Sequence, residues 1–357
     1  MNNQELLGLI CQAFEQEIPL ALVTVIKVIG SAYRREGAKM VVRADGESAC
    51  MISGGCLEPE VIEVAKEVLA TGKSQRRYYD LSEDSMWGLG LGCGGAVELW
   101  IEPLERGGMV GRWLEHTLPT PTFLIRNLST GDILWYEANH QEGHLSPDIQ
   151  PWALAQAERL LNSEAPRSKS YRYKEQDIYI DVQTPQDHLI IFGAGHDAKP
   201  LAHYAHELGF KVSIVDARRA FATPEAFPHA EIIIAHAHKL EGQVTIPPHA
   251  QVIIMNHHLE RDRHCLRFAL ASEANYVGVL GPVSRLEKIL TALAEEGIHL
   301  SETEKAKIRN PIGIDIGAEG AEEIAMAVMM ELIALKRGFR AGFLHGRKGR
   351  IHDPSLT

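Results

Sequence analysis

Two loops of the chain combine cysteine with glycine. The first reads Ser53-Gly54-Gly55-Cys56 and precedes a helix expected over residues 57–70; the second, residues 88–95, has five glycines in eight positions and contains Cys93. Glycine backbone can approach a ligand closely and can point successive N–H groups at an anion. A helix N-terminus or such N–H groups also favour the reactive thiolate form of cysteine. We expect ligand-binding residues in both loops, namely Gly54, Gly55, Cys56, Gly92, Cys93 and Gly94.

Other interpretations of the two cysteines stay open. Each could be a small buried residue in a tight turn, or the two could form a redox disulfide, since the sequence does not fix their distance. The chain has five cysteines in all, an odd number, and no C-x-x-C spacing. This count argues against a secreted disulfide scaffold and against a four-cysteine zinc site.

A third glycine loop has the form of a phosphate-binding turn. Residues 193–198, GAGHDA, follow the apolar strand LIIFG and open a helix, and they fit G-x-G-x-x-A. The first glycine allows the turn, the second lets backbone approach a phosphate, and the small third residue lets the helix pack on the strand. Asp216 ends the next strand, 21 residues after Gly195, where an acid accepts hydrogen bonds from ribose hydroxyls. The predicted binding residues are Gly193, Gly195, His196, Ala198 and Asp216.

These loops need two kinds of domain to position them. From residue 189 onward, short apolar strands alternate with helices, which predicts a Rossmann-like, doubly wound parallel sheet covered on both faces. The earlier part contains hairpins and helices and is expected to be an α+β domain. We place the boundaries at 1–185 for the α+β domain, 186–340 for the Rossmann-like domain, and 341–357 for a basic C-terminal tail.

More polar residues follow the expected parallel strands, where ligands bind in this fold. His236 and His238 come after the third strand, and His257 and His258 after the fourth. We expect polar residues lining a cleft, with a zinc or proton-transfer site as the alternative, and we place His257 and Asp262 in that cleft. Asp315 either caps the last helix, expected over residues 319–336, or faces the cleft.

Composition narrows the class of protein. The chain has 357 residues, with 36 Lys and Arg against 47 Asp and Glu, a formal net charge of −11. This acidic balance argues against a partner made of nucleic acid. The first residues form an amphipathic helix without a basic n-region, and no uncharged apolar run approaches 18 residues. We therefore expect a cytoplasmic protein without a membrane partner.

Several segments together resemble the XdhC/CoxI family, the accessory factors of xanthine dehydrogenase and related molybdenum hydroxylases. They are GSAYRREGAKM, ISGGCLEPE, GLGLGCGGAVELWIEPL, HLIIFGAGHDAKPLA, VSIVDARRAF, NHHLERD, YVGVLG and NPIGIDIGAEGAEEIAMAVMMELIAL. The resemblance covers nearly the whole chain. It implies a maturation factor that binds the molybdenum cofactor (molybdopterin), protects it while a cysteine desulfurase adds the terminal sulfur, and passes it to the apo-hydroxylase.

The resemblance also implies roles for particular residues. The loop at 193–198 would hold the phosphate of molybdopterin, and Cys56 and Cys93 would be the ligands of its soft metal end. Two positions depart from the family pattern. Asn256-His257-His258 stands where members often show Thr-His-Asp, and the pair Ser284-Arg285 is displaced. These departures leave open whether a nucleotide is attached to the pterin.

The resemblance favours a non-catalytic carrier. The apolar helices of the sequence favour a homodimer. An NAD(P)-dependent oxidoreductase is the main alternative, based on Gly193, Gly195, Ala198 and Asp216, although no catalytic Tyr-x-x-x-Lys or Ser/His pair stands out. A thiol redox module using Cys56 and Cys93 is a further alternative.

Overall fold

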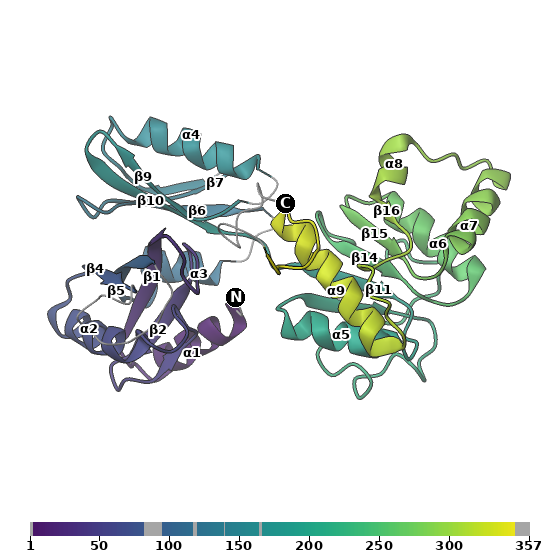
Figure 1. Ribbon diagram of the computed structural model, residues 1–357, viewed down its shortest axis with the longest axis horizontal. Coiled ribbons are helices and arrows are strands. Elements are labelled where there is room, and N and C mark those ends of the chain that lie inside the picture. The colour runs from purple at the N-terminus through teal and green to yellow at the C-terminus, as the bar shows by residue number, and fades with distance from the viewer. Residues whose placement is uncertain (1–2, 82–94, 117–119, 139, 164–165, 347–357) are drawn as a thin grey trace. The chain divides into compact units, whose positions relative to one another are not determined.

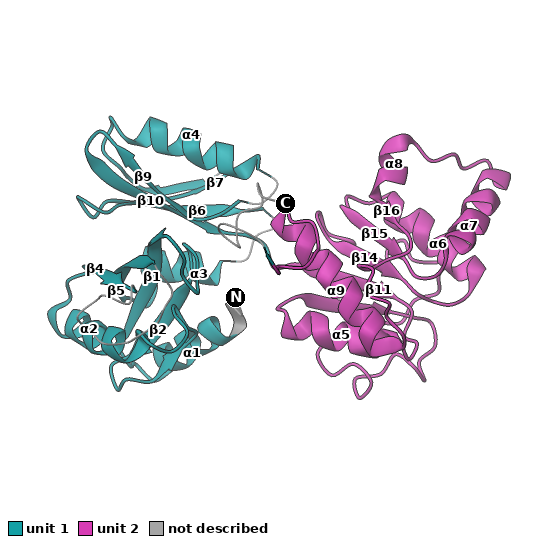
Figure 2. Cartoon of the chain, viewed as in Figure 1, with its two compact units in different colours: residues 1–185, 346–353 teal, residues 186–345, 354–357 magenta. Residues whose placement is uncertain are grey.

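The computed structural model describes residues 3–81, 95–116, 120–138, 140–163 and 166–346. The chain divides into two compact units (Figure 2), one made mostly of Met1–Pro185 and the other mostly of Gln186–His345. Of the described helices, none is long and apolar enough to cross a membrane.

The first sheet of the first unit is antiparallel, in the order β3-β2-β1-β5-β4. Its strands are β1 (Leu20–Ile29), β2 (Lys39–Arg43), β3 (Ser48–Ala49), β4 (Gln75–Asp80) and β5 (Ala96–Leu104). Alternate residues of β1 face two different apolar cores: Ala21 and Val23 pack with α2 (Glu58–Thr71), whereas Leu22 packs with α1 (Asn3–Glu15) and α3 (Met109–Glu115). Burial of both faces explains why β1 is apolar at every position except Thr24 and the exposed Lys27.

The second sheet of this unit is also antiparallel, in the order β8-β7-β6-β10-β9. Its strands are β6 (Thr122–Asn127), β7 (Ile133–Glu137), β8 (His140–Gly143), β9 (Lys169–Tyr173) and β10 (Gln176–Gln183), and α4 (Gln150–Leu161) packs on it. Two buried ion pairs join the sheets. Lys39 Nζ lies 2.7 Å from Asp181 Oδ2, and an Arg126 nitrogen lies 2.6 Å from Glu102 Oε1.

The second unit is a parallel sheet in the order β13-β12-β11-β14-β15-β16 (Figure 1). The strands are β11 (His188–Phe192), β12 (Lys211–Val215), β13 (Glu231–Ile233), β14 (Gln251–Ile254), β15 (Tyr276–Val279) and β16 (Ile308–Arg309). The order reverses between β11 and β14, so this junction is the switch point at which such sheets bind ligands. The predicted α/β class with a C-terminal Rossmann-like sheet is confirmed.

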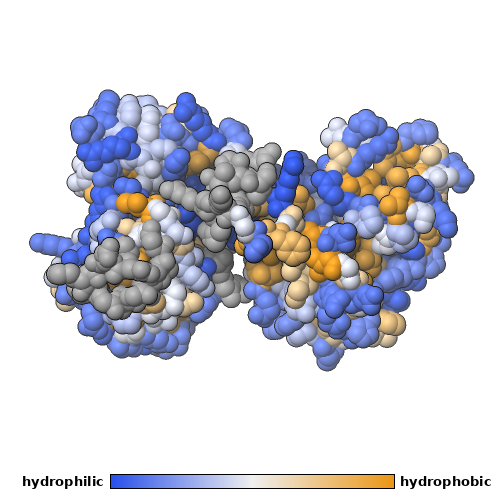
Figure 3. Space-filling model, viewed as in Figure 1, coloured by the Kyte–Doolittle hydropathy of each residue, from blue (hydrophilic) through white to orange (hydrophobic). Residues whose placement is uncertain are grey.

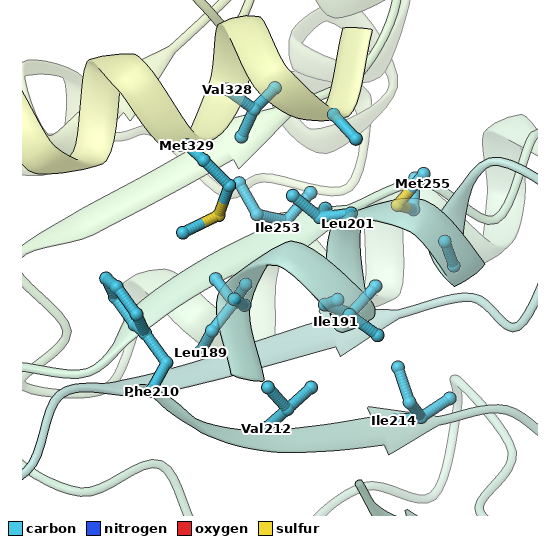
Figure 4. Packing of buried hydrophobic residues seen from close by; sticks show 14 of the residues in the cluster. Leu189, Ile191, Leu201, Phe210, Val212, Ile214, Ile253, Met255, Val328 and Met329 are labelled. Atoms are coloured by element: carbon cyan, nitrogen blue, oxygen red, sulfur yellow. The ribbon is translucent and has the colours of Figure 1, made fainter. Parts of the chain in front are cut away.

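Helices cover both faces of this sheet. α5 (Ala198–Glu207) and α9 (Ala321–Arg337) pack on one face, where Figure 4 shows Val328 and Met329 of α9 above Leu201 of α5 and the strand residue Ile253. α6 (Leu259–Leu270) and α7 (Val283–Glu295) cover the other face. The short helix α8 (Glu302–Lys307) leads into β16. Two apolar layers therefore fix the strand ends that carry the polar residues.

Candidate functional site

The loop after β11 is held by close backbone packing. Gly193 has a φ of 119°, and a Cβ there would lie 2.6 Å from the carbonyl oxygen of Met255. A side chain at this position would therefore meet both strain and a clash with the end of β14. The N–H of the next residue, Ala194, donates to Asp216 Oδ2 at 2.8 Å. The loop is thus tied to the ends of β12 and β14.

Three N–H groups at the start of α5 are available to a ligand. The amides of Gly195, His196 and Asp197 donate to no acceptor among the described residues. A Cβ at Gly195 would be in ordinary contact only, 3.8 Å from His257 Cδ2, so the space in front of this backbone is open. Ala198 is buried and lets the helix pack closely on the sheet. Successive free N–H groups at a helix N-terminus fit a phosphate.

Asp216 is positioned differently from the sequence-based expectation. Its side chain is 1% exposed, and its two oxygens accept hydrogen bonds from Ala194 N–H and from the backbone and guanidinium of Arg218. Burial alone would raise the pKa of Asp216, but these hydrogen bonds outweigh it and lower the pKa. The Arg218 guanidinium also lies 4.5 Å from the centroid of the Phe221 ring. The carboxylate therefore braces the glycine loop, and a ribose would have to displace Arg218.

His257 lies beside the same loop. It has a positive φ of 57°, unusual for a residue other than glycine, and its Nε2 is 3.1 Å from Asp197 Oδ2. Its side chain is 56% exposed, and His196 is exposed as well. The structure therefore brings His196 and His257 to the glycine loop at 193–198. The sequence placed His257 in the cleft, but it is not among the lining residues of the cavity described below.

Asp262 and Asp315 do not join this group. The Asp262 side chain is 1% exposed, and it accepts hydrogen bonds from the backbone and side-chain amides of Asn256, both at 3.1 Å, and from Arg285 at 2.5 Å. It therefore holds the turn from β14 into α6. The sequence left Asp315 either capping the last helix or facing the cleft. Asp315 is exposed, α9 begins after Gly320 with no side-chain cap, and Asp315 is not among the residues that line the cavity described below.

A cavity of about 330 Å³ lies at the carboxyl ends of β11, β12, β13 and β14. Its lining includes His236, His238 and His258, which the sequence placed in a cleft, and also Arg261 and His264 from the first turns of α6. The latter two were missed because helical spacing alone did not show which side of α6 faces the strand ends. The remaining lining residues are Phe192, Val215, Asp216, Ala217, Ala235, Ala237, Leu240, Asn256, Glu260 and Cys265.

The histidines and Arg261 give the cavity hydrogen-bonding side chains, but its described residues form no metal centre. Burial raises the pKa of the Cys265 thiol to about 12, so this cysteine stays protonated and makes a poor metal ligand. Over the part of the chain that the structure describes, no three His, Cys, Asp or Glu side chains are grouped to hold a metal ion. The histidines therefore remain available for hydrogen bonding and stacking.

In the first unit, the Cys56 loop is closed by a serine and a glutamate. Ser53 Oγ accepts from the N–H groups of Gly55, Cys56 and Leu57, each at 3.2 Å, and donates to the carboxylate of Glu58. Burial would raise the pKa of Glu58, but the hydrogen bonds from Ser53 outweigh it and lower that pKa. The N–H groups that the sequence offered as an anion nest are therefore occupied. The half-buried Cys56 and the exposed backbone of Gly54 are what remain for a ligand.

The residues that flank the second cysteine loop lie near the first. Gly92, Cys93 and Gly94 lie outside the described residues, but the residues on either side of that segment are joined by a hydrogen bond from Leu81 N–H to Gly95 O at 2.8 Å. A Cβ at Gly95 would overlap the carbonyl oxygen of Ser31, and one at Gly54 would lie 3.9 Å from Tyr33 Cδ2. The residues that flank the second loop thus share one end of the sheet with the Cys56 loop.

Comparison with known proteins identifies the family. Residues 189–332 match the model of the XdhC Rossmann domain, and residues 13–80 match the model of the XdhC and CoxI family. The chain belongs to the XdhC and CoxI family. The two matched segments contain Cys56 and the whole loop at 193–198, whereas Cys93 lies between them.

Two relatives of this XdhC and CoxI chain match it over most of their length. A Bacillus subtilis protein named as a probable subunit of xanthine dehydrogenase is 28% identical, with 90% of this chain and 95% of the relative covered. The molybdenum cofactor insertion chaperone PaoD of Escherichia coli is 26% identical, with 88% and 83% covered. A crystal structure described as a xanthine dehydrogenase from Bacillus halodurans has a TM-score of 0.76 at 28% identity, covering 95% of this chain and 97% of that one.

Proposed function

We propose that this chain is a maturation factor for a molybdenum hydroxylase of the xanthine dehydrogenase type. In this proposal it binds the molybdenum cofactor, holds it during sulfuration by a cysteine desulfurase, and passes it to the hydroxylase. Membership of the XdhC and CoxI family supports the role, as do the names of two relatives, one a probable part of xanthine dehydrogenase and the other a molybdenum cofactor insertion chaperone. We further propose that the protein acts in the cytoplasm and performs no turnover of its own.

One feature of the structure carries the proposal, namely the free amides at the start of α5. The free amides of Gly195, His196 and Asp197 open onto unfilled space, and they are the donors that a phosphate requires. Molybdopterin carries one phosphate, and its bound metal has a preference for sulfur ligands. The Cys56 loop offers a partly exposed thiol on a backbone fixed by Ser53, which fits the soft metal end. We assign Cys93 the same role.

A homodimer is part of the proposal. The outer face of α9 exposes Met326 and Met330, 45% and 39% accessible, and Leu335 near its end is 47% accessible. Figure 3 shows apolar surface over the region of the second unit where α9 lies. Exposed apolar side chains grouped on one helix are typical of a protein contact.

Molybdenum and pterin content is the direct test. The full chain is purified from a host that makes the cofactor, in parallel with Cys56→Ala, Cys93→Ala and, as a matched control, Cys11→Ala, whose thiol is exposed on α1. We expect molybdenum and pterin with the wild type and the control, and at least a tenfold loss of molybdenum in the other two variants. A wild type that carries neither, together with a hydroxylase that matures without this protein, would refute the proposed function.

A further inference from the structure

The cavity at the strand ends continues directly from the phosphate loop. Phe192, in its lining, precedes Gly193, and Asp216, also in the lining, accepts from the N–H of Ala194. A ligand whose phosphate lies on the amides of Gly195–Asp197 therefore has the cavity beside it. The volume of about 330 Å³ is in the range of small-molecule sites. The phosphate loop alone does not account for this additional space.

The lining is suited to a flat heterocycle. Its floor is apolar and consists of Phe192, Val215, Ala235 and Leu240 from strand ends and loops, and of Cys265 from α6. Six charged or imidazole side chains surround that floor, and none of them has a hydrogen-bond partner in the described parts of the chain: His236, His238, His258, Glu260, Arg261 and His264. Imidazole and guanidinium planes stack on bases, and their nitrogens bond to base edges.

The acid that would bind ribose in a dinucleotide enzyme is already occupied in this pocket. Both oxygens of Asp216 are engaged by Arg218 and by Ala194 N–H. The rings of His236 and His238 are 5.4 Å apart at 38°, so they do not stack on each other. Recognition in this cavity therefore depends on the base, through side chains from the ends of β13 and β14 and from α6.

We propose that the cavity is the subsite for the nucleoside of a nucleotide whose phosphate lies on the loop at 193–197. The proposal rests on the proposed function, and it names the cargo: the form of the pterin cofactor in which a nucleotide is joined to the pterin phosphate. A pterin phosphate alone would occupy only the loop and leave the cavity to water. A cofactor that carries a nucleotide would place its phosphate on the loop and its nucleoside in the cavity.

Calorimetry on the full chain tests the subsite without any cofactor. The probes are CMP, GMP, AMP, NAD and inorganic phosphate. We expect at least one nucleoside monophosphate to bind ten or more times tighter than phosphate. Ala237→Trp, which fills the cavity, removes that difference while phosphate binding persists. His229→Ala, on an exposed histidine stacked with His206, leaves it unchanged.

The pair His236→Ala and His238→Ala repeats the test if Ala237→Trp fails to fold, and is expected to lower nucleotide affinity at least tenfold. Equal affinity for nucleotides and phosphate overturns the subsite. Tighter binding of NAD than of every monophosphate overturns it in favour of a dinucleotide coenzyme.

Analysis of the bound cofactor separates this inference from the proposed function. Mild acid treatment of the pterin carried by the purified wild type releases a nucleoside monophosphate, and we expect one per pterin. Pterin without nucleotide would overturn the inference and leave the proposed function intact. Nucleotide binding by a protein that never carries pterin would overturn the proposed function and the named cargo, while the nucleoside subsite would stand.

Discussion

Replacing Gly193 by alanine should destabilise the second unit selectively. A φ of 119° is strained for any residue with a Cβ, at a cost of about 1–3 kcal/mol. The new methyl would also lie 2.6 Å from Met255 O and 2.8 Å from Met255 C, both of them backbone atoms that cannot rotate away. Adding about 1 kcal/mol for the overpacking, we expect a loss of about 2–4 kcal/mol in the free energy of unfolding.

Gly195→Ala is the matched control, two residues further on. Its methyl meets only His257 Cδ2 at 3.8 Å, and its φ is not positive, so we expect a change in stability below about 1 kcal/mol. The methyl would nevertheless stand in the open space in front of the free amides. The Gly195→Ala protein should therefore be as stable as the wild type but bind phosphate-bearing ligands more weakly. Each 1.4 kcal/mol of binding free energy that the methyl removes lowers the affinity about tenfold.

The assay can follow each unit separately. All five tryptophans, at positions 87–152, belong to the first unit, so their fluorescence follows that unit alone. Hydrogen exchange in urea, measured on peptides from 188–215, follows the second unit. With a urea dependence of about 1–3 kcal/mol per molar, Gly193→Ala should lower the midpoint of those peptides by about 1–2 M. Equal midpoints for Gly193→Ala and Gly195→Ala would refute the reasoning.

Three further outcomes are expected. Ser53→Ala leaves three amides without their acceptor and should lower the stability of the first unit by about 1–2 kcal/mol, read by tryptophan fluorescence in urea. Arg285→Met leaves the buried Asp262 without its cation and should cost the second unit about 3–5 kcal/mol in the same exchange assay, whereas a loss below about 1 kcal/mol would contradict the pairing. Burial and the charge of Lys211 lower the pKa of His188 to about 4 from 6.5, so its contribution to stability is complete above pH 6.5 and is lost as the pH falls toward 4. His188→Gln should flatten that pH dependence, and an unchanged slope would count against the assignment.

Patterns with a simple period were predictable from the sequence. The parallel strands of the second unit are buried on both faces and therefore read as short apolar runs, which is why the Rossmann-like sheet could be placed. The glycine loop at 193 was predictable because its neighbours on both sides have strong periodicity. Short elements were not: α8 has 6 residues and β16 has 2, too few to show a period.

The chemistry of the site was less predictable, because it depends on side chains that satisfy backbone groups. The glycines before Cys56 indicated free amides, but Ser53 Oγ already accepts from three of them. Asp262 has the residue type of a ligand-binding carboxylate, yet Arg285 and Asn256 bury it. Neither pairing has a sequence signature, since each depends on the path of the chain between the partners.

Asp216 also separates the two functions that the glycine loop allows. An NAD-dependent enzyme uses such an acid to bind ribose, and here that would mean breaking the hydrogen bonds between a carboxylate that is 1% exposed and Arg218. Exposing the two charges to a neutral ribose would cost about 3 kcal/mol or more, and this cost alone weakens affinity about 100-fold. A nucleotide held by its phosphate and its base, with ribose hydroxyls that make no bond to Asp216, has no such cost. The amides of residues 195–197 and the charged and imidazole side chains around the cavity have no partners to lose among the described residues. The local bonding of Asp216 therefore favours a carrier of a phosphate-bearing cofactor over an NAD-dependent oxidoreductase.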